Sequence, residues 1–246
     1  MLAMVCWLLL LGAGQGAGQG TGQGSLGWQC PAPASAGLQC GCELAHTLRC
    51  DGEAGPAALR SLLGELAAAP ARQSVALLDL SVRGMVRLPA RLFTNLSLPL
   101  SGLVISTGAL TRVPPRAFTG LERGLRALGL PDNKLQQPPT AAMQPLQLLT
   151  RLDLSGNLLT GLHSLPALPE LEYLDLSRNQ ISVLAAGVTR GAPSLRTLVL
   201  SSNRLGVGTL SQHSLAHLTY LTHLHLDSNR LEGSLTRSAT ASIFLQ

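Results

Sequence analysis

Charged and aromatic side chains are scarce in this chain of 246 residues. Charged residues make up 13% of it and aromatic residues 3%, whereas ordinary globular domains have about 25% charged residues. The shortage of aromatic rings disfavours a nucleic-acid binder that stacks on bases. Lysine is almost missing too, since Lys134 is accompanied by 17 arginines. The net charge of +5 permits an anionic partner but does not require one.

Leucine is the abundant residue, with 55 positions in a chain that is 46% hydrophobic. A disordered chain would be poor in leucine and rich in charge, so disorder is excluded for most of the sequence. The chain has enough apolar material for a sizeable core.

The amino terminus predicts secretion. An apolar run from Leu2 to Leu11 precedes small residues and contains no acidic group, which is typical of a signal peptide over residues 1–18, cleaved near Gly16 or Gly18. A membrane anchor is the alternative, but about 20 apolar residues are needed to cross a bilayer as a helix. Residues 19–29 are rich in glycine and are expected to form a flexible leader.

Four cysteines remain after Cys6 is removed with the signal peptide: Cys30, Cys40, Cys42 and Cys50. An even number of clustered cysteines in a secreted chain predicts two disulfides in a cap over residues 30–74. Four thiolates could instead bind zinc, but secretion exposes them to oxidation and the spacing contains no C-x2-C pair. The spacing leaves all three disulfide pairings open.

A repeat of about 24 residues follows the cysteines and occupies residues 75–235. Its seven copies fit the leucine-rich repeat L-x-x-L-x-L-x-x-N-x-L. They are VALLDLSVRGM from Val75, LSGLVISTGAL from Leu100, LRALGLPDNKL from Leu125, LTRLDLSGNLL from Leu149, LEYLDLSRNQI from Leu171, LRTLVLSSNRL from Leu195 and LTHLHLDSNRL from Leu221.

The repeat predicts an α/β solenoid, a leucine-rich repeat horseshoe with parallel strands on its concave face and loops or short helices on its convex face. Apolar residues at positions four and six alternate with polar ones, as in a strand with one buried face. No repeat can bury that face alone, so the repeats stack. Position nine is expected to be structural, with an interior amide that satisfies backbone groups; it holds Asn133, Asn157, Asn179, Asn203 and Asn229.

The first two repeats depart from this pattern, with Arg83 and Gly108 in place of asparagine. Phe93 and Phe118 recur 25 residues apart and are expected to fill the convex side of the core. Within the cap, the leucines between 59 and 66 have helical spacing and predict a short helix on the open end of the first repeat.

Together, the signal peptide, the cysteine cluster and the repeats resemble an extracellular leucine-rich repeat ectodomain with a cysteine-rich cap. That group includes Slit, chondroadherin and the small leucine-rich proteoglycans, and the early repeats also resemble the arthropod chaoptin and artichoke proteins. The resemblance implies that Cys30 pairs with Cys42 and Cys40 with Cys50. Nine residues separate the first two cysteines here, more than in the usual cap. Residues 236–246 are expected to be an incomplete eighth repeat without a carboxyl-terminal cap.

The concave face is the expected partner-binding surface, with a tyrosine exposed at its centre. Its candidate residues are Arg151, Asp153, Tyr173, Asp175, Thr197, Val199, His223 and His225. Asp153 and Asp175 lie on adjacent strands, but an open surface would desolvate neither, so acid and base catalysis is not expected. Side chains two apart on a flat strand stand roughly parallel, so the histidines predict no metal site. No catalytic or phosphate-binding motif is present, and we expect neither an enzyme nor a cofactor.

Two arginine pairs recur 25 residues apart, Arg87 with Arg112 and Arg91 with Arg116. They predict a small basic strip that could contact sulfated glycans or acidic protein. Asn95 begins the N-x-S/T sequon of the chain and is the predicted glycosylation site.

These features predict a secreted or cell-surface scaffold that binds another protein in adhesion, matrix organisation or receptor recognition. The alternative is a soluble innate-immune module that binds microbial glycans.

Overall fold

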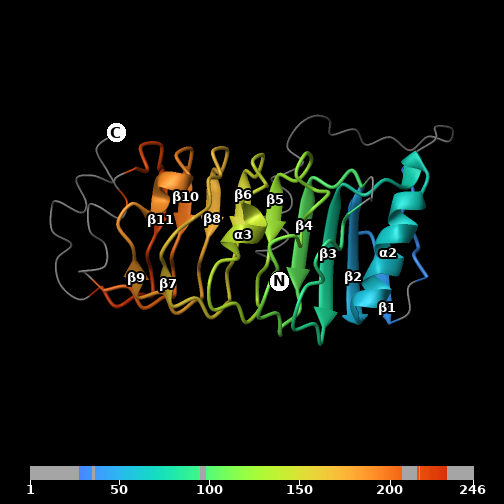
Figure 1. Ribbon diagram of the computed structural model, residues 1–246, viewed down its shortest axis with the longest axis horizontal. Helices are drawn as coiled ribbons and strands as arrows, with labels where there is room; N and C mark the ends of the chain where they lie inside the picture. The colour runs from blue at the N-terminus through green and yellow to red at the C-terminus, as the bar shows by residue number, and fades with distance from the viewer. Residues whose placement is uncertain (1–27, 35–36, 95–97, 207–214, 216, 232–246) are drawn as a thin grey trace.

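The computed structural model describes residues 28–34, 37–94, 98–206, 215 and 217–231. The chain forms a stack of coils that runs from right to left in the view of Figure 1. One nine-stranded sheet runs along the whole stack, in the order β1-β2-β3-β4-β5-β6-β8-β10-β11. Its strands are β1 (Leu38–Gly41), β2 (Thr47–Glu53), β3 (Leu77–Arg83), β4 (Gly102–Ser106), β5 (Ala127–Gly129), β6 (Arg151–Asp153), β8 (Tyr173–Asp175), β10 (Thr197–Val199) and β11 (His223–His225). The solenoid fold predicted from the repeats is therefore confirmed.

The repeat pattern explains the burial of each strand. In β6, Leu152 is fully buried and is flanked by the partly exposed Arg151 and Asp153. From β2 to β11 the strands pair in parallel, so that leucines at the same repeat position are neighbours, such as Leu152 beside Leu174. The result is one continuous core of leucine side chains from the cap to the last described repeat.

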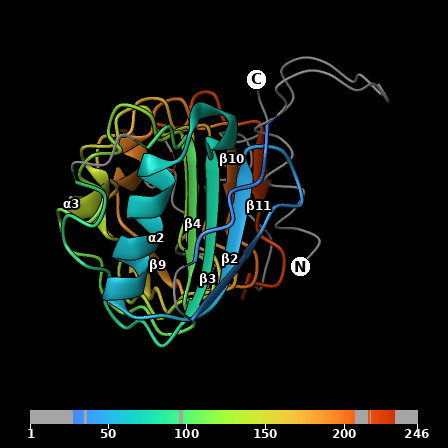
Figure 2. The ribbon, with the colours of Figure 1, turned by 90° about the vertical axis from the view of Figure 1, so that its right-hand side faces the viewer.

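The convex side carries short elements. They are the helix α3 (Thr140–Met143), the 3-10 helix η2 (Val188–Gly191) and a two-stranded sheet of β7 (Gly161–Leu162) with β9 (Val183–Leu184). Figure 2 shows α3 on the side of the coil opposite to β2 and β11. Phe93 and Phe118 are buried in the core, as predicted, and Met143 of α3 follows after another 25 residues and is also buried.

The cap extends the main sheet, which the sequence did not predict. Strand β2 pairs in parallel with β3, and β1 closes the sheet as its antiparallel neighbour. The predicted helix is α2 (Pro56–Ala68), which lies at the amino-terminal end of the stack and buries Leu59, Leu62, Leu63 and Leu66. A second short element, the 3-10 helix η1 (Ala71–Gln73), leads into β3.

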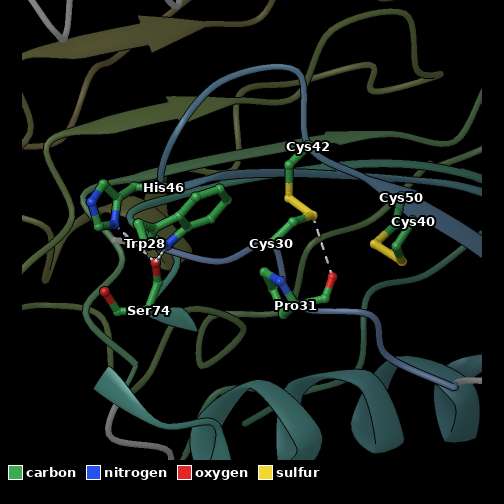
Figure 3. The surroundings of a disulfide bond; sticks show 8 residues. All are labelled: Trp28, Cys30, Pro31, Cys40, Cys42, His46, Cys50 and Ser74. Carbon is green, nitrogen blue, oxygen red and sulfur yellow. Dashed lines mark hydrogen bonds between the residues drawn. A yellow bond between two sulfur atoms is a disulfide. The ribbon is translucent and has the colours of Figure 1, made fainter. Parts of the chain in front are cut away.

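Two disulfides hold the cap together (Figure 3). Cys30 is bonded to Cys42, and Cys40 of β1 is bonded to Cys50, its partner residue on β2. Trp28 and Gln29, which were expected to belong to the leader, also contact this cap. The indole N–H of Trp28 donates to the carbonyl of Ser74 at 2.7 Å, and Gln29 donates its backbone N–H to Arg72. The cap therefore includes at least these two residues.

The asparagines of the repeats form a ladder inside the solenoid. The amide nitrogen of Asn179 donates to the carbonyls of Leu154 in the preceding repeat and Leu176 in its own, each at 3.0 Å. Its amide oxygen accepts the backbone N–H of Leu159 at 3.1 Å. Asn133 and Asn157 donate in the same way, and so do Asn203 and Asn229, of which Asn229 is only partly buried.

Thr107 replaces the missing asparagine in the second repeat. Its buried hydroxyl accepts the N–H of Leu110 at 2.8 Å and lies 2.9 Å from the Asn133 amide oxygen. In the five asparagine-containing repeats, the residue before the asparagine is left-handed, whereas here that conformation falls on Gly108 itself, with φ of +66°. The turn is thus shifted by one residue, which explains why glycine stands at position nine.

Four predicted features lie outside the described residues. These are the signal peptide, most of the glycine-rich leader, the glycosylation site Asn95 and the incomplete eighth repeat.

Candidate functional site

The eight candidate residues of the concave face form two straight rows across four neighbouring strands, and we call them the concave patch. The first row is Arg151, Tyr173, Thr197 and His223, and the second is Asp153, Asp175, Val199 and His225. Because neighbouring strands lie about 4.8 Å apart, each row spans about 14 Å. The repeat register alone creates these rows, since equivalent positions of successive repeats lie side by side.

Tyr173 is partly buried, which corrects the expectation of an exposed ring. Its ring packs against Val104 and Ala127, the small concave residues of β4 and β5. The guanidinium carbon of Arg151 lies 5.8 Å from the ring centroid, within the range of a cation–π contact. The hydroxyl donates to the carboxylate of Asp175 at 3.4 Å. Tyr173 is therefore held in one orientation, with part of its side chain exposed.

The expectation that neither carboxylate of this face is desolvated is wrong for Asp153. Burial raises the pKa of Asp153 from 3.8 to about 6, and the nearby carboxylate of Asp175 adds to the rise. Hydrogen bonds from Ser155 oppose it, including a backbone N–H at 2.8 Å. Burial and the charge of Asp175 also raise the pKa of the Tyr173 hydroxyl. The carboxylate of Asp153 is therefore not in free solvent.

Asp153 makes the stability of the solenoid depend on pH. Between pH 3.8 and about 6 the folded chain binds a proton that the unfolded chain does not, so its contribution to stability rises as the pH falls from 7 to 5. We expect Asp153→Asn to stabilise the fold at pH 7 by about 1 to 2 kcal/mol, and by less at pH 5, because the amide carries no charge. Urea unfolding at both pH values measures this difference. An equal effect of the substitution at both pH values would contradict the assignment.

Asp79 is a second buried carboxylate, which the repeat pattern did not predict. It occupies the equivalent position on β3, is 3% exposed, and lies 3.9 Å from the guanidinium of Arg49 on β2. Burial raises its pKa, and Arg49 opposes the rise. The burial of Asp79 could have been predicted only from the pairing of β2 with β3. That pairing was not predicted because the strand in the cap was not recognised.

Neither a metal site nor a membrane span is found in the described part of the chain. No group of three or more histidine, cysteine, aspartate or glutamate side chains converges there in a way that could hold a metal ion. Among the same residues, no helix has both the length and the apolar character needed to cross a bilayer.

The four arginines predicted as a basic strip are brought together on the loops that follow β3 and β4. Arg87 and Arg112 are paired as a parallel bridge, and the backbone N–H of Arg91 donates to the carbonyl of Arg116 at 2.8 Å. All four residues are exposed. The strip is therefore a two-by-two array on the surface of the first two repeats.

Comparison with known proteins agrees with the repeat geometry. The family described as "Leucine rich repeat" matches residues 99–159, 123–181 and 169–231, which together exceed half of the chain. The chain belongs to the leucine-rich repeat family.

Individual relatives match only part of the chain. It is 44% identical over 87 residues to the mouse transforming growth factor beta activator LRRC32, covering 34% of this chain and 13% of that protein. It is 37% identical over 82 residues to mouse podocan, covering 33% of this chain and 13% of podocan. The matched segment thus spans about an eighth of the length of these two relatives.

Among solved structures, the complex of TLR13 with a single-stranded RNA matches with a TM-score of 0.63 and 23% identity. That match covers 78% of this chain and 27% of the TLR13 chain, and it supports the fold. The two disulfides of the cap fit an extracellular location, where thiols are oxidised.

Proposed function

We propose that this chain is a secreted or cell-surface scaffold that binds another protein through the concave patch, in adhesion, matrix organisation or receptor recognition. The observation that carries the proposal is the ordered pair of rows around Tyr173. Interface energy concentrates in a few tyrosine, tryptophan and arginine residues, and here a tyrosine and an arginine stack on each other beside two carboxylates.

The energetics of the patch favour a protein partner. Tyr173 is already fixed by Val104, Ala127 and Asp175, so a partner loses little entropy in ordering it. The histidines of β11 are exposed, and the patch passes from acidic and aromatic groups on β8 to imidazoles on β11. A partner that covers all four strands would therefore contact several kinds of side chain, which gives specificity.

The double substitution Arg151→Ala and Tyr173→Ala tests the proposal. The probe is an array of recombinant matrix and cell-surface ectodomains, and the affinity of each ectodomain that binds the wild-type chain is measured for the variant. We expect a loss of about 2 kcal/mol or more, about thirtyfold in affinity.

The matched control is Arg204→Ala with Tyr220→Ala, which removes the same residue types outside the patch, where Tyr220 is 62% exposed. Thermal unfolding checks that both variants remain folded. If the control weakens binding as much as the patch variant, the concave patch is not the binding surface.

A second candidate surface is the basic strip, which we propose as a site for an anionic partner such as a sulfated glycan. The specific observation in its favour is that all four arginines are exposed and that no described residue forms an ion pair or hydrogen bond with their guanidinium groups.

A further inference from the structure

A groove lies beside the basic strip on the first three repeats. It encloses about 780 Å³, and both Arg87 and Arg112 line it. The third repeat contributes Gln136 and Gln137, and Thr111 lies between the two ends. Gln137 follows Arg112 by 25 residues, as Arg112 follows Arg87, so the groove passes from two cationic side chains to neutral amides.

The backbone beneath the strip is pinned at both rows of arginines. The N–H of Leu88 donates to the carbonyl of Arg112 at 3.3 Å, and that of Arg91 donates to the carbonyl of Arg116 at 2.8 Å. Prolines separate the rows, with Pro89 in the first repeat and both Pro114 and Pro115 in the second. Because proline fixes its own φ angle, the backbone positions of the four arginines are preorganised.

The charges of the strip are not neutralised within the described protein. The ion pairs between described residues involve Arg49, Arg83, Arg178 and Arg196, none of which belongs to the basic strip. Four positive charges on neighbouring loops repel one another, and an anion that contacts several of them relieves this repulsion. Planar guanidinium groups bind tetrahedral oxyanions through paired N–H donors.

The other residues that line the groove indicate which chemical groups the ligand carries besides its anionic groups. Gln136 and Gln137 can each donate and accept hydrogen bonds, which suits hydroxyl groups. The Thr111 hydroxyl donates to the carbonyl of Val86 at 3.3 Å and can still accept a hydrogen bond. Val113 and Pro115 provide an apolar surface for the C–H face of a sugar ring. None of the described residues that line the groove is aromatic, so bases of a nucleic acid would have no stacking partner among them.

We propose that this groove and the basic strip form one binding site for a sulfated polysaccharide, which lies across the first three repeats with its sulfates on Arg87, Arg112, Arg91 and Arg116 and its hydroxyls on Gln136, Gln137 and Thr111. This inference rests on the basic strip proposed above and adds the groove, with the residues that would contact the sugar hydroxyls. It is independent of the concave patch, because the strip residues lie on the loops after the strands.

The test is to measure the affinity of the purified chain for heparin, chemically desulfated heparin, hyaluronan and polyglutamate at low and high salt. Heparin should bind at least about tenfold more tightly than the three other polymers, because only its sulfates match the guanidinium array. Its affinity should fall steeply with added salt.

Variants assign the binding to the groove. Arg87→Gln with Arg112→Gln should weaken heparin binding by about tenfold or more. Arg60→Gln with Arg204→Gln removes the same net charge from exposed arginines outside the groove and should change the affinity by about twofold or less. Gln136→Ala with Gln137→Ala should lower the affinity for heparin about threefold. The salt dependence of binding should stay unchanged, because these contacts are neutral.

The outcomes separate the inference from the strip on which it rests. If polyglutamate binds as tightly as heparin and loses its affinity with the same two arginines, the strip is an acidic-protein site and the glycan inference is wrong. The glycan inference and the basic strip are both wrong if replacing Arg60 and Arg204 weakens heparin binding as much as replacing Arg87 and Arg112. They are also both wrong if no polyanion loses affinity when Arg87 and Arg112 are replaced.

Discussion

Replacing Asn179 with alanine is expected to lower the free energy of unfolding by about 2 to 4 kcal/mol. The carbonyls of Leu154 and Leu176 each keep a second donor, from Asn157 and Asn203 respectively. The backbone N–H of Leu159 has no such replacement, because its acceptor is the Asn179 amide oxygen. The substitution therefore leaves one buried donor unpaired and removes hydrogen bonds that join two repeats. Denaturant unfolding monitored by circular dichroism measures the loss.

The last asparagine of the ladder, Asn229, supplies a control. Asn229 makes the same kind of bonds but is only partly buried, so water can replace its amide and Asn229→Ala should cost about 1 kcal/mol or less. Gln180→Ala, next to Asn179 and outside the ladder, should cost about 0.5 kcal/mol or less. Equal costs at Asn179 and Gln180 would show that the ladder is not what holds the turns in place.

Removing the Phe118 ring should destabilise the solenoid even more, by about 3 to 5 kcal/mol. Phe118 is 2% exposed, and Phe93 one repeat earlier is fully buried. The loops that carry them stack so closely that a Cβ on Gly120 would collide with the carbonyl of Phe93. Because the backbone is in contact there, the loops cannot move inward to fill the space that Phe118→Ala would leave. Thermal and denaturant unfolding measure the effect.

Two variants calibrate this prediction. Phe118→Leu keeps most of the side-chain volume and should cost about 1 to 1.5 kcal/mol. Val86, in the first repeat, has a side chain that is 51% exposed. Val86→Ala should therefore cost about 0.5 kcal/mol or less. A cost for Phe118→Ala as small as that for Val86→Ala would mean that the convex side is not tightly packed.

The repeat pattern predicted the solenoid and the two rows of the concave patch because one geometric rule, equivalent positions side by side, fixes both. Leu152 and Leu174 are neighbours in the structure for the same reason that Arg151 and Tyr173 are. The burial of Phe93 and Phe118 followed from their recurrence at the repeat spacing.

Other features depend on contacts that no local pattern contains. The cap strands β1 and β2 join the main sheet because the first repeat offers a free strand edge, and their sequence has no leucine-rich pattern of its own. Thr107 acts in the ladder only because the left-handed turn is shifted onto Gly108. The raised pKa of Asp153 arises from burial, to which the charge of Asp175 on the next strand adds, whereas the sequence suggested an open surface.

The most direct test of the concave patch is hydroxyl-radical footprinting, with mass spectrometry, of the chain alone and bound to an ectodomain selected in the array. Tyr173, His223 and His225 should lose reactivity on binding, because a partner seated on the two rows covers them. Tyr220, 62% exposed and outside the patch, should react equally in both states. Protection of Tyr220 with unchanged reactivity at Tyr173 and both histidines would contradict the proposal that the concave patch is the binding surface.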